Sequence, residues 1–160
     1  MLRGIMEKLK SVISIYPQLV TSSAAVTGSG VDTIGYGSCM IEVSVGAAGD
    51  TWSSSNKYSL EVLVSDDNSS FSAAADSDLY SVASAGGSYA SPSGTVAASG
   101  GFKVLSNSGA GVQEKQNYKI GYRGTHRYVA AKVNKAGTLS TGTYFSASVI
   151  LGHADAEPVS

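Results

Sequence analysis

The sequence is poor in cysteine, in charged residues and in long apolar runs. Its single cysteine, Cys39, excludes an intramolecular disulfide and a metal site built from several thiolates. Only 14% of the 160 residues are charged and the net charge is −1, so the basic surface of a nucleic-acid-binding protein is missing. No apolar run approaches the roughly 18 residues of a transmembrane helix. We therefore expect neither a nucleic-acid partner nor a membrane partner.

Glycine, serine and hydrophobic residues make up most of the chain. There are 19 glycines and 28 serines, and 42% of the residues are hydrophobic. A chain of this length can bury roughly 68–70% of its unfolded surface. The composition thus predicts a folded domain with a core, and it lacks the high charge of a disordered chain.

The chain starts with apolar residues at spacings of three and four, which is typical of an amphipathic helix. Pro17 would end such a helix, because the residue before a proline is pushed out of helical geometry. The pattern predicts a first unit over 1–16, a short helix or an arm that docks on its own domain or on a neighbouring subunit. Charged residues at 3, 7, 8 and 10 interrupt the apolar segment that a signal peptide needs, so we expect a product made in the cytoplasm. The candidate contact residues of this unit are Leu2, Ile5, Met6, Leu9 and Ile13.

From residue 17 to residue 160 the apolar period changes to two, which is typical of strands with one buried face. Clusters of Gly, Asp, Asn and Ser separate these stretches and predict tight turns. Short strands with such spacing predict an all-β fold, an antiparallel jelly-roll-like β-sandwich or a barrel. The clear stretches are 37–46, 57–64, 127–133 and 145–151, and the weaker ones are 19–26, 71–75, 102–106 and 117–122.

Residues 81–101 form a stretch rich in Ser, Gly and Ala with few large apolar side chains. Such a stretch has little to bury, so it predicts an exposed excursion from the domain. Loops of this length in a compact domain are uncommon and often functional, and here we expect a contact loop.

The sequence shows no arrangement of residues that predicts catalysis or a cofactor. Only two histidines are present, without the carboxylates and thiols that a metal site would add. The Asp66-Asp67-Asn68 run resembles the start of a calcium loop, but Phe71 and Ser77 occupy its sixth and twelfth positions, so an Asx turn is expected instead. Trp52 is expected to cap a hairpin at the sandwich rim rather than to stack on a sugar. We expect no enzyme activity, no metal and no cofactor.

A second group of candidate contact residues combines tyrosine with basic side chains. Tyr and Arg dominate protein interfaces, since both offer large contact areas with polar tips. The alternative is an ordinary sheet whose Tyr and Arg side chains are solvated. The group comprises Tyr118, Tyr122, Arg123, His126, Arg127 and Tyr128.

Several blocks of the sequence, in this order, are similar to a family of small structural proteins of tailed bacteriophages and prophages. The blocks are 30–36 (GVDTIGY), 45–51 (VGAAGDT), 60–61, 65–67, 118–129 (YKIGYRGTHRYV), 149–153 (VILGH) and 156–159.

The resemblance implies a virion component without catalytic residues, of the decoration or cement type that lies on the capsid surface. Its implied partners are the major capsid protein and copies of the chain itself, as a homo-oligomer with a trimer favoured. Two alternatives stay open. One is a component of the tail, neck or fibre, and the other is a carbohydrate-binding or adhesin module.

Overall fold

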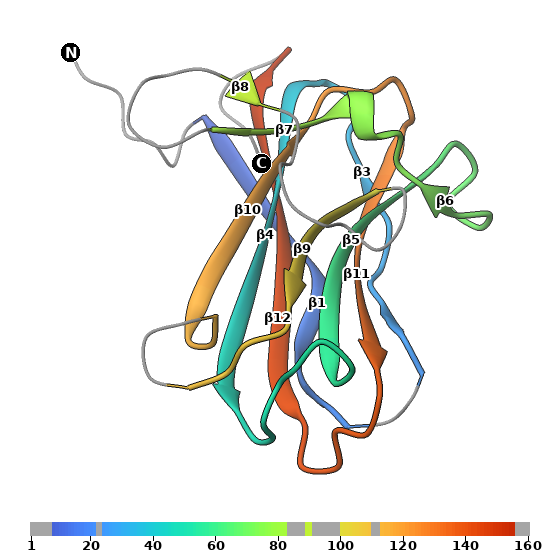
Figure 1. The fold of residues 1–160 in the computed structure, drawn as a ribbon. Helices are drawn as coiled ribbons and strands as arrows, with labels where there is room; N and C mark the ends of the chain where they lie inside the picture. Colours follow the sequence, from blue (N-terminus) through green and yellow to red (C-terminus); the bar gives the residue numbers. More distant parts are fainter. Residues whose placement is uncertain (1–7, 22–23, 83–88, 91–99, 110–112, 156–160) are drawn as a thin grey trace.

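The fold is known from a computed structural model that describes residues 8–21, 24–82, 89–90, 100–109 and 113–155. Two antiparallel sheets pack face to face, which confirms the predicted all-β sandwich (Figure 1). The described residues contain one short helical segment, the 3-10 turn η2 (Asp76–Asp78).

The first sheet has the strand order β1-β12-β4-β10-β7-β8. Its long central strands pair antiparallel, with a register irregularity between Thr143 and Phe145, and the expected strand at 145–151 lies within β12. The bounds are β1 (Leu9–Val20), β12 (Thr143–Ala154), β4 (Tyr36–Ala48), β10 (Gln116–Tyr122), β7 (Leu79–Val82) and β8 (Tyr89–Ala90).

The second sheet has the order β2-β11-β5-β6, with β3 also paired to β11 and β9 also paired to β5. Strand β5 is buried on both faces over most of its length. The bounds are β2 (Val26–Thr27), β3 (Val31–Asp32), β5 (Lys57–Ser65), β6 (Ser72–Ala73), β9 (Gly101–Leu105) and β11 (Tyr128–Ala136).

The expected N-terminal helix is wrong from Leu9 onward, because Leu9–Val20 is a strand that crosses the expected boundary at residue 16. A spacing of three and four over so few residues does not distinguish helix from strand. Val12, Ile13 and Ile15 are β-branched and favour extended backbone, and β12 offers them a ladder. Pro17 is accommodated because β1 lies at the edge of its sheet, where a missing N–H breaks no inner ladder. Residues 1–7, with Leu2, Ile5 and Met6, lie outside the described residues.

The stretch 81–101 is described only in part. β7 and β8 pair as a small hairpin in which Ser81 faces Ala90 and Val82 faces Tyr89, and β9 begins at Gly101. The remainder of the expected excursion lies outside the described residues.

The core between the sheets is filled by the inward side chains of each alternating strand. Tyr58 is fully buried in this core, and its ring centre lies 4.9 Å from that of Phe145 and 5.7 Å from that of Trp52. The Tyr58 hydroxyl donates to the Val20 carbonyl at 2.8 Å, so its polar end is satisfied. Trp52 is only 3% exposed, which rules it out as a surface platform for sugars.

Candidate protein-binding face

Large apolar side chains are exposed along β1 and its neighbour β12. Four of the six such side chains among the described residues lie on β1, and a fifth lies on β12. Single exposed hydrophobic residues are normal on any protein, but a contiguous group marks an interaction site. We call these five side chains the β1–β12 apolar surface: Leu9, Ile13, Tyr16, Leu19 and Tyr144.

The strand register explains why these side chains are exposed. Leu9 and Ile13 are four residues apart without a bulge between them, so they share the outer face of β1. Leu19 lies opposite Tyr144 in the ladder and the two side chains are cross-strand neighbours. Ile13 is 46% exposed and Tyr144 is 60% exposed, so both are available to a partner.

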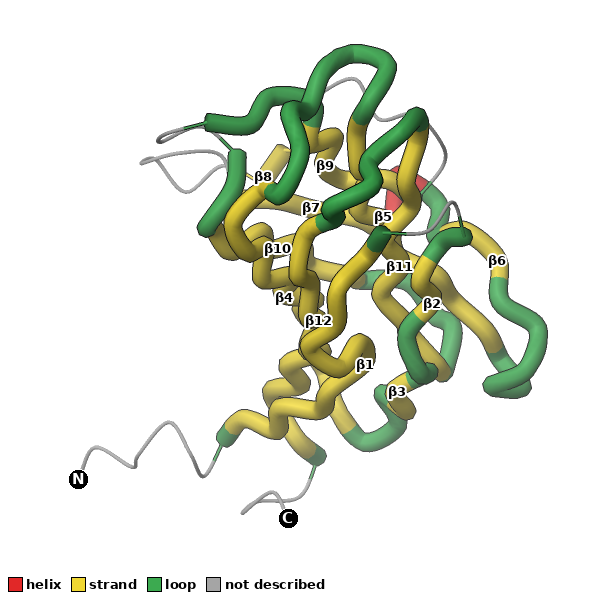
Figure 2. The backbone as a smooth tube through the Cα atoms, turned by 90° about the horizontal axis from the view of Figure 1, so that it is seen from below, coloured by secondary structure: helices red, strands yellow, loops and turns green. Residues whose placement is uncertain are grey.

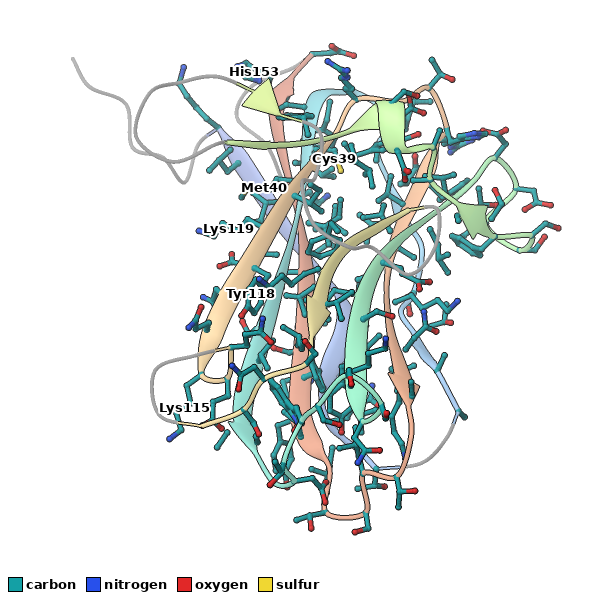
Figure 3. The ribbon with its side chains drawn as sticks, in the orientation of Figure 1. Cys39, Met40, Lys115, Tyr118, Lys119 and His153 are labelled. Carbon is teal, nitrogen blue, oxygen red and sulfur yellow. The ribbon has the colours of Figure 1, made fainter. Side chains whose placement is uncertain are left out.

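The same outer face continues across β12 and β4 with smaller or half-buried side chains. Ile150 pairs with Met40, and Ser148 pairs with Glu42. Glu42 also forms an ion pair with Lys119 of β10 at 3.6 Å, and Lys119 projects away from the sandwich (Figure 3). The face is therefore apolar at the β1 edge and becomes polar toward β10, as an interface with a polar rim would be.

Ser14 anchors this edge strand to the second sheet. The strand register shifts between Ile13 and Ile15, which places Ser14 in an irregularity of β1. Its buried hydroxyl donates to the Ser29 carbonyl at 2.9 Å and accepts from the Ala131 N–H at 3.1 Å. The edge strand is thus fixed in position while its outer side chains stay exposed. In the view from below, β1 and β12 run side by side at the edge of the molecule (Figure 2).

The structure separates the second group of candidate contact residues from the first. β10 belongs to the first sheet and β11 to the second, so residues 123–127 form the connection between the two sheets. Tyr122 is 4% exposed, which leaves almost no surface for a partner. The Tyr118 ring is half-buried against the core, and its hydroxyl donates to the Gln113 carbonyl at 2.9 Å.

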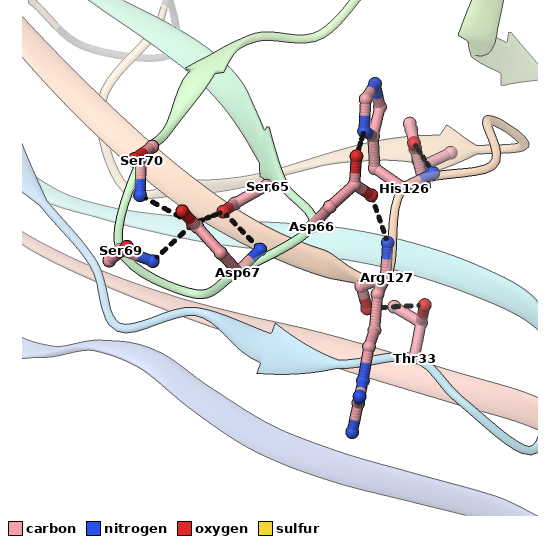
Figure 4. A network of polar contacts seen from close by, with 9 residues as sticks. Thr33, Ser65, Asp66, Asp67, Ser69, Ser70, His126 and Arg127 are labelled. Atoms are coloured by element: carbon pink, nitrogen blue, oxygen red, sulfur yellow. Dashed lines mark hydrogen bonds and ion pairs between the residues drawn. The ribbon is translucent and has the colours of Figure 1, made fainter.

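The basic residues of this group take part in polar contacts within the molecule (Figure 4). His126 Nδ1 lies 3.0 Å from one carboxylate oxygen of Asp66. The other oxygen of the same carboxylate accepts the backbone N–H of Arg127 at 3.4 Å. The Arg127 guanidinium pairs with Asp32 at 2.7 Å and lies 5.0 Å from the Tyr128 ring centre. The hydrogen bond from Arg127 lowers the pKa of Asp32 and raises that of Arg127. These contacts join the loops at one end of the sandwich, and the side chains of His126 and Arg127 remain partly exposed.

The Asx turn expected at Asp67 is present. Its carboxylate accepts the Ser69 and Ser70 N–H groups at 2.8 and 2.7 Å and the Ser65 hydroxyl at 2.8 Å. These hydrogen bonds lower the Asp67 pKa, the Ser70 N–H most strongly. The Asp67 carboxylate therefore stabilises the turn.

Metal-ligand clusters and the single thiol were the remaining candidate sites in the described part of the chain. It contains no group of three or more His, Cys, Asp or Glu side chains that could hold a metal ion. Cys39 is buried between the sheets, and burial raises its thiol pKa to about 12, so it is not a reactive thiolate. Among the described residues, no helix has the length and apolar character to cross a membrane.

Of the exposed side chains of the β1–β12 apolar surface, the sequence analysis named Leu9 and Ile13 as contact candidates and did not name Tyr16, Leu19 and Tyr144. The signal for Tyr144 was available, because it alternates with inward Phe145 and shares its parity with Ser146, Ser148 and Ile150. Tyr16 is the last residue of the expected helix or arm, and Leu19 begins the weaker strand candidate 19–26, for which no exposed face was predicted.

In comparisons with known proteins, no family model and no curated protein matched the chain.

Proposed function

We propose that the chain is a non-enzymatic structural protein of a tailed-phage particle, most simply a decoration protein on the outside of the head. The β1–β12 apolar surface is the observation that carries this proposal. A rigid sandwich with apolar side chains gathered at one sheet edge is suited to contact between proteins. The phage particle is proposed because the sequence resembles structural proteins of tailed phages.

Binding to a shell would use this surface repeatedly. Symmetric copies that touch one another and a shell multiply weak contacts, since each attached copy raises the local concentration of the next contact. Binding also stabilises the folded chain by mass action, which suits a sandwich without disulfides. The partners are then copies of the chain, as a trimer, and the major capsid protein.

The test is the amount of the chain in purified particles. Tailed particles from a strain that carries the gene are separated into heads and tails, and the chain is quantified against the major shell protein by mass spectrometry. We expect a fixed ratio to the shell protein in the head fraction. Enrichment with tails would place the chain in the tail or neck, and absence from all particles would refute a virion role.

A further inference from the structure

A small polar pocket lies at the end of the sandwich where the β3–β4 turn, β7 and the end of β10 meet. Its volume is about 190 Å³. It shares no residue with the β1–β12 apolar surface, so it needs an explanation of its own. The lining residues are Thr33, Tyr36, Gly37, Ser38, Cys39, Tyr80, Tyr122, Arg123 and Gly124.

Three tyrosines from distant parts of the sequence line this pocket. Tyr122 is buried, its hydroxyl accepts the His126 N–H at 3.1 Å, and burial raises its pKa, so it stays a neutral phenol at physiological pH. Tyr80 packs against Gly121 so closely that a Cβ there would lie 2.2 Å from the ring. These two rings are therefore held in place by the fold. Tyr36, at the start of β4, is half-buried.

Arg123 is the one lining residue with a permanent charge. Its Nε and Nη2 atoms both donate to the Ser77 carbonyl, at 3.1 and 2.9 Å, which fixes the plane of the guanidinium. An arginine has five N–H donors, so three remain beyond these two bonds. Ser38 adds a hydroxyl, which lies 2.9 Å from His153 Nδ1. No aspartate or glutamate is among the nine lining residues, and the Asp78 carboxylate lies beside one of them, Gly124, where a Cβ would be 2.7 Å from its Oδ2.

Size and lining together restrict the ligand. Pockets for drug-sized molecules have volumes of roughly 300–1,000 Å³, so this one suits a molecule of about one sugar ring. A tyrosine ring can stack on the C–H face of a sugar ring, and the Ser38 hydroxyl can hydrogen-bond to the sugar's polar edge. The oriented Arg123 guanidinium can pair with a carboxylate. We propose that this pocket binds a single acidic sugar, with its carboxylate on Arg123 and its ring against Tyr36 and Tyr80. The proposal does not depend on attachment to a particle.

The test is a titration of the ¹⁵N-labelled full chain, followed by NMR, with methyl glucuronide, N-acetylneuraminic acid and neutral methyl glucoside. We expect shifts of the Gly37 and Gly124 amides with at least one acidic sugar, and binding at least tenfold weaker for the neutral sugar. Arg123→Gln should weaken acidic-sugar binding about tenfold or more, and Tyr36→Ala should also reduce it.

Lys119→Gln and Tyr144→Ala are matched controls, since they remove a cation and an exposed tyrosine outside the pocket. Both should bind like the wild type, and thermal unfolding of all four variants confirms that they are folded. The proposal is overturned by an absence of shifts at the pocket with every acidic sugar, by equal binding of the neutral sugar, or by unchanged binding in folded Arg123→Gln.

Discussion

Ile13 and Ile15 lie two positions apart on β1 but have opposite surroundings. Ile13 is 46% exposed, whereas Ile15 is 1% exposed and belongs to the core, because the irregularity at Ser14 separates them. Ile15→Ala should lower the free energy of unfolding by about 2–5 kcal/mol, through lost burial and a cavity. Ile13→Ala should change it by less than about 0.5 kcal/mol.

Urea unfolding of the two variants measures this difference directly. Similar losses of stability in both would show that Ile13 packs inside the molecule, and the β1–β12 apolar surface would then lose its central member.

Asp67 gives the stability of the sandwich a predictable dependence on pH. Its carboxylate is stabilised by hydrogen bonds in the folded state, so its folded pKa is below the unfolded value of about 3.9. The stabilisation is therefore present above about pH 4 and is lost as the pH falls through the folded pKa. Asp67→Asn should be less stable than the wild type at pH 7, and the difference should shrink below pH 4.

Ser70→Ala serves as the control, since it keeps the N–H that Asp67 accepts and leaves the carboxylate in place. Unfolding midpoints between pH 2 and pH 7 give the comparison. A difference between wild type and Asp67→Asn that is constant over this range would contradict the assignment.

At the scale of single residues, alternation in the sequence predicted the inward side chains, but it did not predict that Glu61 and Leu63 on the other face of β5 are buried as well. Alternation placed Cys39 in the core and the Asp-Asp-Asn cluster identified the Asp67 turn, because both depend on near neighbours in sequence. The pocket brings together Tyr36, Tyr80 and Arg123 from three distant segments of the chain. A pattern of neighbouring residues could not predict that these segments meet.

Ser14 is one of the side chains that join strand β1 to the second sheet, and Tyr58 of β5, which donates to the Val20 carbonyl, is another. Ser14→Ala would remove the acceptor of the Ala131 N–H, which lies inside β11, and leave that buried donor unpaired. An unsatisfied buried group costs about 1–3 kcal/mol, so the variant should lose that amount of stability. Ser11→Ala, at an exposed position of the same strand, should not. Equal stability of both variants in urea unfolding would show that Ser14 does not anchor the edge.

The extent of β1 also determines which N-terminal deletions the fold tolerates. Deleting residues 1–7 leaves β1 whole, whereas deleting residues 1–15 removes more than half of the strand, including buried Ile15. The longer deletion should lower the thermal midpoint strongly or prevent folding, and the shorter one should leave it near the wild-type value. Circular dichroism melts test both, and a stable product of the longer deletion would show that β1 is dispensable.

The error at β1 has a physical cause. Between Leu9 and Ile13 the apolar positions fit a helix as well as a strand, and the choice is made by the free edge of β12, which is more than 120 residues away in the sequence. The inner strands show the two-residue apolar period in their own sequence, so the strands β4, β5, β11 and β12 were predicted correctly. Edge elements with mixed patterns depend more on their neighbours than inner ones do.

For the whole molecule, the class of fold followed from the change of period and the turn residues. The pairing order β1-β12-β4-β10 did not, since antiparallel strands of similar length and composition fit several orders. The β1–β12 apolar surface therefore could not be predicted from the sequence, because it depends on β1 lying beside β12. The account depends on the claim that this β1–β12 apolar surface joins copies of the chain.

Sedimentation velocity over a range of protein concentrations tests that claim most directly. The wild type should form a discrete oligomer, and the double variant Ile13→Ser, Tyr144→Ser should sediment as a monomer with an unchanged unfolding midpoint. The matched change Lys119→Gln, at the polar end of the same face, should leave the oligomer largely intact. A wild type that stays monomeric at every concentration, or a double variant that assembles as well as the wild type, would contradict the account.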